Sequence, residues 1–134
     1  MVLNHSDEII NRWVRQAEHD LENAKKNLDI EAYDVSLILC QQAVEKMLKA
    51  LYLKHRSENP PKVHSLVYLA QTSRLELPDL IKEFLENLDE VSVPTRYPEE
   101  LDKILMEYDE QRTRIIFEKT KEAMQCLMNE VKKS

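Results

Sequence analysis

The stretch VSLILCQQAVEKMLKALYLKH, residues 35–55, decides the fold of this chain. At 100° per residue, its apolar side chains cover about half of a helix circumference, which is wider than the stripe of a surface helix. We therefore expect a helix over about 32–56 with other helices packed on two sides. One stripe of this helix starts apolar, at Val35 and Ile38, and then turns polar with Gln42, Glu45, Lys46 and Lys49. This change indicates a helix that leaves the core and lines a cleft.

Helical periodicity also dominates on both sides of this stretch. A first helix is predicted from Ser6, acting as N-cap with acidic residues in the first turn, to about residue 28. After the break at Asn59-Pro60-Pro61, a short third helix is predicted over Val63–Ser73. A fourth helix should start with Pro78 at its first position.

The last third of the chain contains a proline-rich break and one more amphipathic segment. Val91–Pro98 holds two prolines and predicts a loop, and a last helix is expected from about Leu101 or Tyr108 to Val131. Loops between these segments are short, and no repeat or low-complexity segment is present. The predicted fold is all-α: an antiparallel up-and-down bundle of about five helices, with residues 1–134 forming a single helical domain.

The chain has 134 residues and no glycine, although average usage of about 7% would give roughly nine. Glycine adopts positive φ at low cost and lets the backbone approach a phosphate closely. Its absence excludes a Walker A loop, a dinucleotide-binding glycine fingerprint and a GxxG clamp on nucleic acid. Any phosphate would have to be held by side chains.

Composition places the chain among soluble helical proteins. There are 25 acidic against 19 basic side chains, for a net charge of −6. No apolar run approaches the ~18 residues that span a bilayer, and the N-terminal MVLNHSDEII lacks the pattern of a signal peptide. Cys40 and Cys126 are far apart and are interpreted as reduced thiols. We expect a cytoplasmic protein with no membrane association.

Charge is distributed unevenly along the chain. Between Lys46 and His64 there are five Lys or Arg residues and one acid, Glu58, whereas Glu76–Glu110 carries mostly acids. This distribution is compatible with ordinary solvated helix faces, or with a charge-steered site beside a repelling surface.

A metal site is not expected. The histidines, at positions 5, 19, 55 and 64, include no pair spaced three to five residues apart, and the chain has no HExxH motif. Neither cysteine is close in sequence to a histidine. We therefore predict neither a metal nor another cofactor.

Two segments hold candidate binding residues. Glu45 and Lys49 have the i,i+4 spacing of a plain surface ion pair; alternatively, Lys46 and Lys49 lie beside His64 and bind a phosphate or an acidic partner. In Thr95-Arg96-Tyr97-Pro98, the prolines hold Arg96 and Tyr97 in a stiff loop, which suits phosphate contact or base stacking. The alternative is that Tyr97 packs over the bundle end while Arg96 pairs with an acid such as Asp89.

Taken together, these segments resemble the HEPN domain family. The resemblance is carried, in order, by Trp13-x-x-x-Ala17-Glu18-x-Asp20-Leu21, Cys40-Gln41-Gln42-Ala43-x-Glu45-Lys46-x-Leu48-Lys49-Ala50, Lys62-x-His64-x-Leu66 and Thr95-Arg96-Tyr97-Pro98. It covers nearly the whole chain. It implies a helical bundle, commonly a homodimer, of the prokaryotic kind that pairs with a small MNT-type nucleotidyltransferase, often as toxin and antitoxin.

Toxic members of the family are metal-independent ribonucleases that use an Arg, four to six intervening residues and a His near the last helices. Here Arg112 and Arg114 have no histidine downstream, and the only formal match, Arg12-x6-His19, lies on the first helix. The catalytic motif is absent from its expected position, which weighs against an enzyme.

We therefore expect a non-catalytic HEPN protein that binds a nucleotide or a nucleotidyltransferase partner, in a toxin–antitoxin-like pair. The candidate ligand-binding residues are Gln42, Glu45, Lys46, Lys49, His64, Arg96 and Tyr97. RNA is a less favoured ligand, because a cationic surface that neutralises phosphates supplies much of the affinity for RNA, whereas this chain has a net charge of −6. The alternatives are an unconventional ribonuclease with His64 or His19 as acid/base, and a purely structural dimerisation module.

Overall fold

The computed structural model describes residues 5–92 and 98–133, and within them the chain forms six helices and no strand. The helices are α1 (His5–Asp29), α2 (Tyr33–Arg56), α3 (Leu66–Thr72), α4 (Asp79–Ser92), α5 (Pro98–Glu107) and α6 (Glu110–Lys132). The all-α prediction is confirmed.

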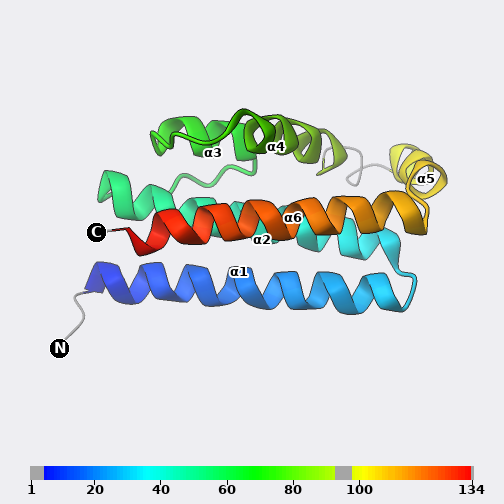
Figure 1. The fold of residues 1–134 in the computed structure, drawn as a ribbon, viewed down its shortest axis with the longest axis horizontal. Helices are drawn as coiled ribbons and strands as arrows, with labels where there is room; N and C mark the ends of the chain where they lie inside the picture. Colours follow the sequence, from blue (N-terminus) through cyan, green and yellow to red (C-terminus); the bar gives the residue numbers. More distant parts are fainter. Residues whose placement is uncertain (1–4, 93–97, 134) are drawn as a thin grey trace.

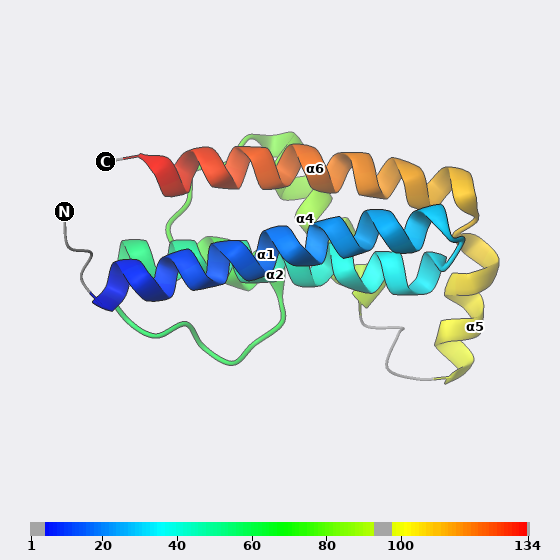
Figure 2. The ribbon, with the colours of Figure 1, turned by 90° about the horizontal axis from the view of Figure 1, so that it is seen from below.

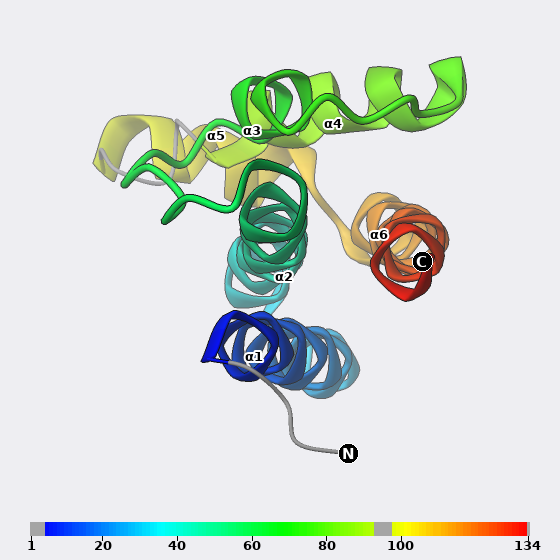
Figure 3. The ribbon, with the colours of Figure 1, turned by 90° about the vertical axis from the view of Figure 1, so that its left-hand side faces the viewer.

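The three long helices α1, α2 and α6 run side by side, with α1 antiparallel to α2 and α6, which run in the same direction (Figure 1). Between α2 and α5 the chain forms two shorter helices, α3 and α4, in place of one long helix. Of these, α4 crosses the long helices at a steep angle instead of running parallel to them (Figure 2). Viewed along the bundle, α2 lies in the middle, with α1 below it, α3 and α4 above it and α6 to one side (Figure 3). This arrangement confirms that α2 is packed on more than one side.

The wide apolar arc of α2 supplies the centre of the core. Val44, Met47, Leu48 and Leu51 of α2 are fully buried, and the other helices contribute Ala17, Leu66, Leu69, Leu85, Leu88, Ala123 and Leu127. Fully burying a side chain of this kind contributes about 1.5–3 kcal/mol. Packing on α2, rather than local helix propensity, therefore holds the bundle together.

Several helix ends differ from the sequence prediction because of particular capping groups. The first helix begins at His5, so Ser6 lies inside it. The third helix begins at Leu66 rather than Val63, because the Ser65 hydroxyl accepts from the Tyr68 N–H at 3.2 Å as N-cap. The Pro78 carbonyl accepts from the N–H groups of Ile81 and Lys82, which places this proline just before α4 instead of at its first position.

The last amphipathic segment is two helices instead of one. Asp109 is the N-cap of α6, where its carboxylate accepts from the Arg112 N–H at 2.9 Å. The chain therefore breaks between Glu107 and Glu110. The region predicted as a loop is also shorter, since α4 continues to Ser92 and α5 begins at Pro98.

Charged side chains tie helix ends from different parts of the chain together. The Lys54 ammonium donates to the carbonyls of Glu130 and Val131 at 3.0 and 2.6 Å, and to that of Lys133. These carbonyls lie in the last turn of α6 and at its C-cap, where the helix dipole also favours a cation. Lys54 thus joins the last turn of α2 to the last turn of α6.

Asp89 of α4 makes a similar connection, but to the N-terminus of a helix, that of α3. Its carboxylate accepts from the N–H groups of Leu66 and Val67 at 2.7 and 3.1 Å, and from the Ser65 hydroxyl at 3.2 Å. These are orphan donors of the first turn of α3. The short helix α3 is therefore held between its own cap and α4.

The described helices include none that is both long enough and apolar enough to cross a membrane.

Replacing Lys54 with Met should lower the free energy of unfolding by about 1.5–3 kcal/mol, because the carbonyls at the end of α6 lose a charged donor. The measurement is urea denaturation followed by circular dichroism. Lys25→Met is the matched control, since Lys25 forms only an exposed ion pair with Asp29, and its loss should change stability by less than about 1 kcal/mol. Equal effects of the two substitutions would contradict the capping role of Lys54.

Candidate functional site

Glu45 of α2 is the centre of a polar cluster formed by α2, α1 and the connection between α2 and α3. Its Oε2 accepts from the Lys49 ammonium at 3.0 Å. Its Oε1 accepts from the Gln41 amide at 3.2 Å and lies 3.0 Å from Nδ1 of His64. The Gln41 amide also donates to the His64 backbone carbonyl at 3.0 Å, so the connection is tied to α2 at two points.

A second ion pair lies next to this cluster and joins α1 to α2. The Lys46 ammonium is 2.7 Å from Oδ2 of Asp20, whose side chain is buried. On the other side, the Lys49 ammonium lies 5.7 Å from the centroid of the Trp13 ring on α1, within the range of a cation–π interaction. Both lysines are therefore engaged by α1 and by acids.

In the polar stripe of α2, Gln42 is exposed and Lys46 is partly buried, but Glu45 and Lys49 are more buried than the apolar residues that precede the stripe. Glu45 and Lys49 are 9% and 8% exposed, whereas Val35 is 39% exposed. The helix thus does not leave the core where its stripe turns polar, and that interpretation of the pattern is wrong. Mutual neutralisation explains the burial, because a buried charge is tolerated when it is paired and hydrogen-bonded.

His64 is the member of the cluster that faces solvent. Its side chain is 66% exposed, while its Nδ1 is held by the buried Glu45 carboxylate. A carboxylate is only an acceptor, so Nδ1 carries the hydrogen, and the neutral ring presents Nε2 as an acceptor. The arrangement fixes the imidazole and leaves its outer nitrogen available to a ligand.

The structure therefore brings together part of the predicted set. Glu45, Lys49 and His64 meet directly, and Lys46 lies one turn away with Asp20. Gln42 is exposed on α2, and its side chain has no hydrogen-bond partner among the described residues. Arg96 and Tyr97, together with the alternative pairing of Arg96 with Asp89, lie outside the described residues.

Sequence reasoning missed three members of the cluster: Trp13, Asp20 and Gln41. Each belongs to one of the segments that carry the family resemblance, although none is in the predicted set of binding residues. For Gln41 the available signal was its position one helical turn before Glu45, whereas Trp13 and Asp20 lie on α1 and could be pointed to only by their place in the motif of that helix.

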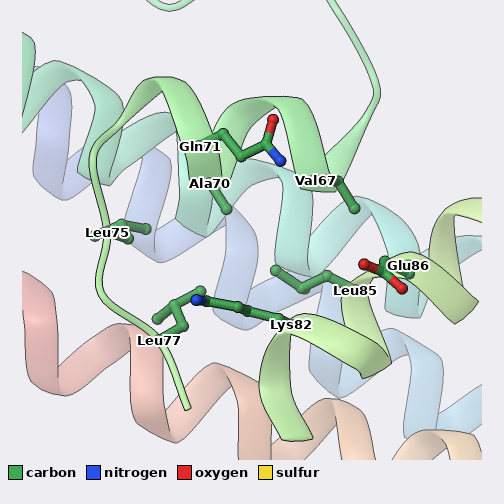
Figure 4. A pocket seen from close by; sticks show the side chains of 8 residues that line it. All are labelled: Val67, Ala70, Gln71, Leu75, Leu77, Lys82, Leu85 and Glu86. Carbon is green, nitrogen blue, oxygen red and sulfur yellow. The ribbon is translucent and has the colours of Figure 1, made fainter. Parts of the chain in front are cut away.

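A separate cavity of about 180 Å³ lies between α3, the connection after it and α4 (Figure 4). Ala70, Leu77 and Leu85 form a buried apolar wall, and the side chain of Lys82 lies beside Leu77 (Figure 4). The cavity is smaller than the ~300 Å³ typical of a small-molecule site, and it contains none of the predicted binding residues.

The described residues contain no group of three His, Cys, Asp or Glu side chains that could hold a metal ion. Burial raises the pKa of the Cys40 thiol to about 11, so this cysteine is a protonated core residue rather than a nucleophile. Arg12 and His19, the formal match to a ribonuclease motif, are both exposed on α1, and His19 is 3.1 Å from the Asn23 amide.

Comparison with known proteins agrees with this architecture. A family model described as "HEPN domain" matches residues 10–133. The fold is similar to that of TT1696 from Thermus thermophilus, with a TM-score of 0.77 and 24% identity over 90% of this chain and 96% of that one. It is also similar to ST0689, an archaeal HEPN homologue, with a TM-score of 0.72 and 24% identity over 92% and 98% of the two chains. No curated protein matches the sequence.

Replacing Glu45 with Gln should lower the free energy of unfolding by about 3–5 kcal/mol, because it leaves the Lys49 ammonium buried without a counter-charge. The double variant Glu45→Gln/Lys49→Met should be more stable than the single variant, since it removes both charges. Urea denaturation of the two proteins and of Lys49→Met measures the difference. A double variant that is as unstable as the sum of the single variants would contradict a buried, coupled ion pair.

Proposed function

This chain belongs to the HEPN domain family, and on that premise we propose that it is a non-catalytic member that binds a nucleotide, or a small nucleotidyltransferase that carries one. The binding face is the one around His64, Lys46 and Glu45. The proposal places the protein in a toxin–antitoxin-like pair and as a homodimer.

The observation that supports binding at this face is the fixed imidazole of His64. Its Nδ1 is held 3.0 Å from the buried Glu45 carboxylate, which is itself held by Gln41 and Lys49. A ring that is oriented before the ligand arrives loses little conformational freedom on binding. The exposed Nε2 then contacts a phosphate oxygen when protonated, or a base or ribose donor when neutral.

The charges within the cluster cancel, which favours a nucleotide whose phosphate charge is already partly neutralised by another protein. Lys46 and Lys49 are paired with Asp20 and Glu45, so the four charges cancel. Free nucleotide phosphates would find no unpaired lysine in the described part of the cluster. A nucleotide carried by a nucleotidyltransferase brings its own protein contacts, and for this reason we favour the carried nucleotide over the free one.

A metal-independent ribonuclease is the second candidate, and the His64–Glu45 pair is the observation in its favour. A carboxylate that orients an imidazole is a common arrangement for general acid–base catalysis. Against it, the arginines at the start of α6 have no histidine downstream, so the family's Arg–His ribonuclease pair is incomplete there. There, Arg114 pairs with Glu110 at 3.3 Å, and Arg112 donates to the Glu107 carbonyl at 2.5 Å.

The dimer is proposed on α1. Ile9, Ile10 and Trp13 are only partly buried within one chain, and a shallow hollow bordered by Ile9, Arg12 and Trp13 lies on this helix. A two-fold contact would cover these side chains. If dimerisation were the whole function, the third candidate, a purely structural module, would be sufficient.

We expect the melting temperature to rise when a co-expressed MNT-type nucleotidyltransferase is bound, and to rise further with millimolar ATP or GTP. A ligand that binds only the folded state stabilises it by about 2.7 kcal/mol at a hundred times its dissociation constant. His64→Ala should reduce the ligand-dependent shift. His19→Ala is the matched control, since His19 is an exposed histidine outside the cluster.

Three results would count against the proposal. An unchanged melting temperature with nucleotides and with the partner would remove its support. RNA cleavage in EDTA that is lost in His64→Ala would establish the ribonuclease instead. A clean monomer by light scattering would exclude the homodimer.

A further inference from the structure

A second surface, on the far side of α2 from His64, is formed by α4 and α6. Two cavities of about 220 and 280 Å³ both border on Phe84, Asn87 and Lys119, so they form one continuous groove. α4 crosses over α6 (Figures 2 and 3), and the residues that line the two cavities belong to these helices and to Tyr108 just before α6. None of the residues of the Glu45 cluster lines it.

The groove has an apolar floor and two exposed apolar side chains on its rims. Phe84, Leu88 and Val91 of α4 are buried beneath it. Leu80 of α4 and Ile115 of α6 stand on the rims and are 79% and 48% exposed. Large apolar side chains exposed next to an apolar cavity mark an interaction surface more often than isolated ones do.

The charged side chains of the groove are mainly acidic. Among the described residues, Glu83, Glu90 and Glu122 border it, against the single basic residue Lys119. A second copy of this chain, with its net charge of −6, would bring the same three acids to the contact. Like charges placed opposite each other in an interface are costly. The charge of the groove therefore selects a basic partner instead of a second copy.

The shape of the groove suits a helix. The residues of α4 that line the groove run from Leu80 to Val91, which is about 17 Å at a rise of 1.5 Å per residue. An amphipathic helix of similar length places its apolar side chains at i, i+3, i+4 and i+7 in such a groove and keeps its polar face in water. The cavities, each under ~300 Å³, suit single side chains rather than a whole small molecule.

We propose that the groove between α4 and α6 binds an amphipathic helix of a partner protein, with apolar side chains seated between Leu80, Phe84 and Ile115 and with Lys or Arg residues opposite Glu83, Glu90 and Glu122. This surface adds a protein-docking site to the face around His64. The two surfaces lie on opposite sides of α2: in Figure 3 the connection that carries His64 is on the left and α6 is on the right. A test of peptide binding in the groove is therefore independent of a test of nucleotide binding at the face around His64.

The test uses two labelled peptides of about 18 residues, long enough to form helix when bound. One has a Leu face and a Lys face, and the other has the same Leu face with Glu in place of Lys. Fluorescence anisotropy with the full chain at physiological salt should show the Leu–Lys peptide binding at least about tenfold more tightly than the Leu–Glu peptide, because only the former complements the three acids.

Substitutions then locate the site. Leu80→Gln/Ile115→Gln should weaken the Leu–Lys peptide by about tenfold or more, since two apolar contacts are lost. Glu83→Gln/Glu122→Gln should also weaken it and reduce its salt dependence. The matched control is Ile30→Gln, because Ile30 is an equally exposed apolar residue, at 73%, in the turn between α1 and α2. Circular dichroism melts of all variants establish that they are folded.

Three outcomes would overturn the proposal. Equal binding of the two peptides would show that charge does not select the partner. Equal weakening by Ile30→Gln would show that the peptide does not bind in the groove. A dimeric wild-type protein that becomes monomeric in Leu80→Gln/Ile115→Gln, measured by light scattering, would assign the groove to a second copy.

Discussion

The carboxylate of Glu45 is the one group through which three parts of the molecule are connected. It lies in the middle of the central helix and binds Lys49 of the same helix, while His64 and Gln41 link it to the connection before α3. Lys49 in turn lies over Trp13 of α1. Because charge transferred from water to a protein interior costs several kcal/mol per ion, these contacts must all form together. The cost imposes one arrangement of α1, α2 and the 57–65 connection.

The same constraint explains why α2 tolerates four charged or amide side chains beside a core. The apolar arc of α2 packs against apolar side chains of α1, α3, α4 and α6, and its polar stripe faces α1 and the connection, where every buried charge has a counter-charge. An apolar replacement of both partners in such a pair often costs little stability. Stability alone therefore does not explain why α2 carries these charged residues. Their position is better explained by the exposed ring of His64, which the Glu45 carboxylate orients.

Much of this fold could be predicted from the sequence, because its signals are periodic. The apolar arc of α2 predicts a helix with several neighbours, and the absence of glycine with well-spaced prolines predicts a bundle. The errors lie at helix ends, which capping groups decide; the start of α3 is set by the Ser65 cap together with Asp89, which is far away in sequence. The break before α6 depends on Asp109 as N-cap, a local signal that is weaker than the apolar periodicity running through it.

The candidate site was only partly predictable, for a physical reason. Spacing on one helix identifies Glu45, Lys46 and Lys49 as neighbours, but it does not show whether their charges are free. That depends on Asp20 and Trp13 of α1, which reach the cluster only when the bundle is assembled. Once they do, both lysines are paired with acids, and the imidazole of His64 is the member of the cluster that is most exposed to solvent. Under the function proposed above, this chain without glycine uses a fixed side chain where other proteins use a phosphate-binding loop.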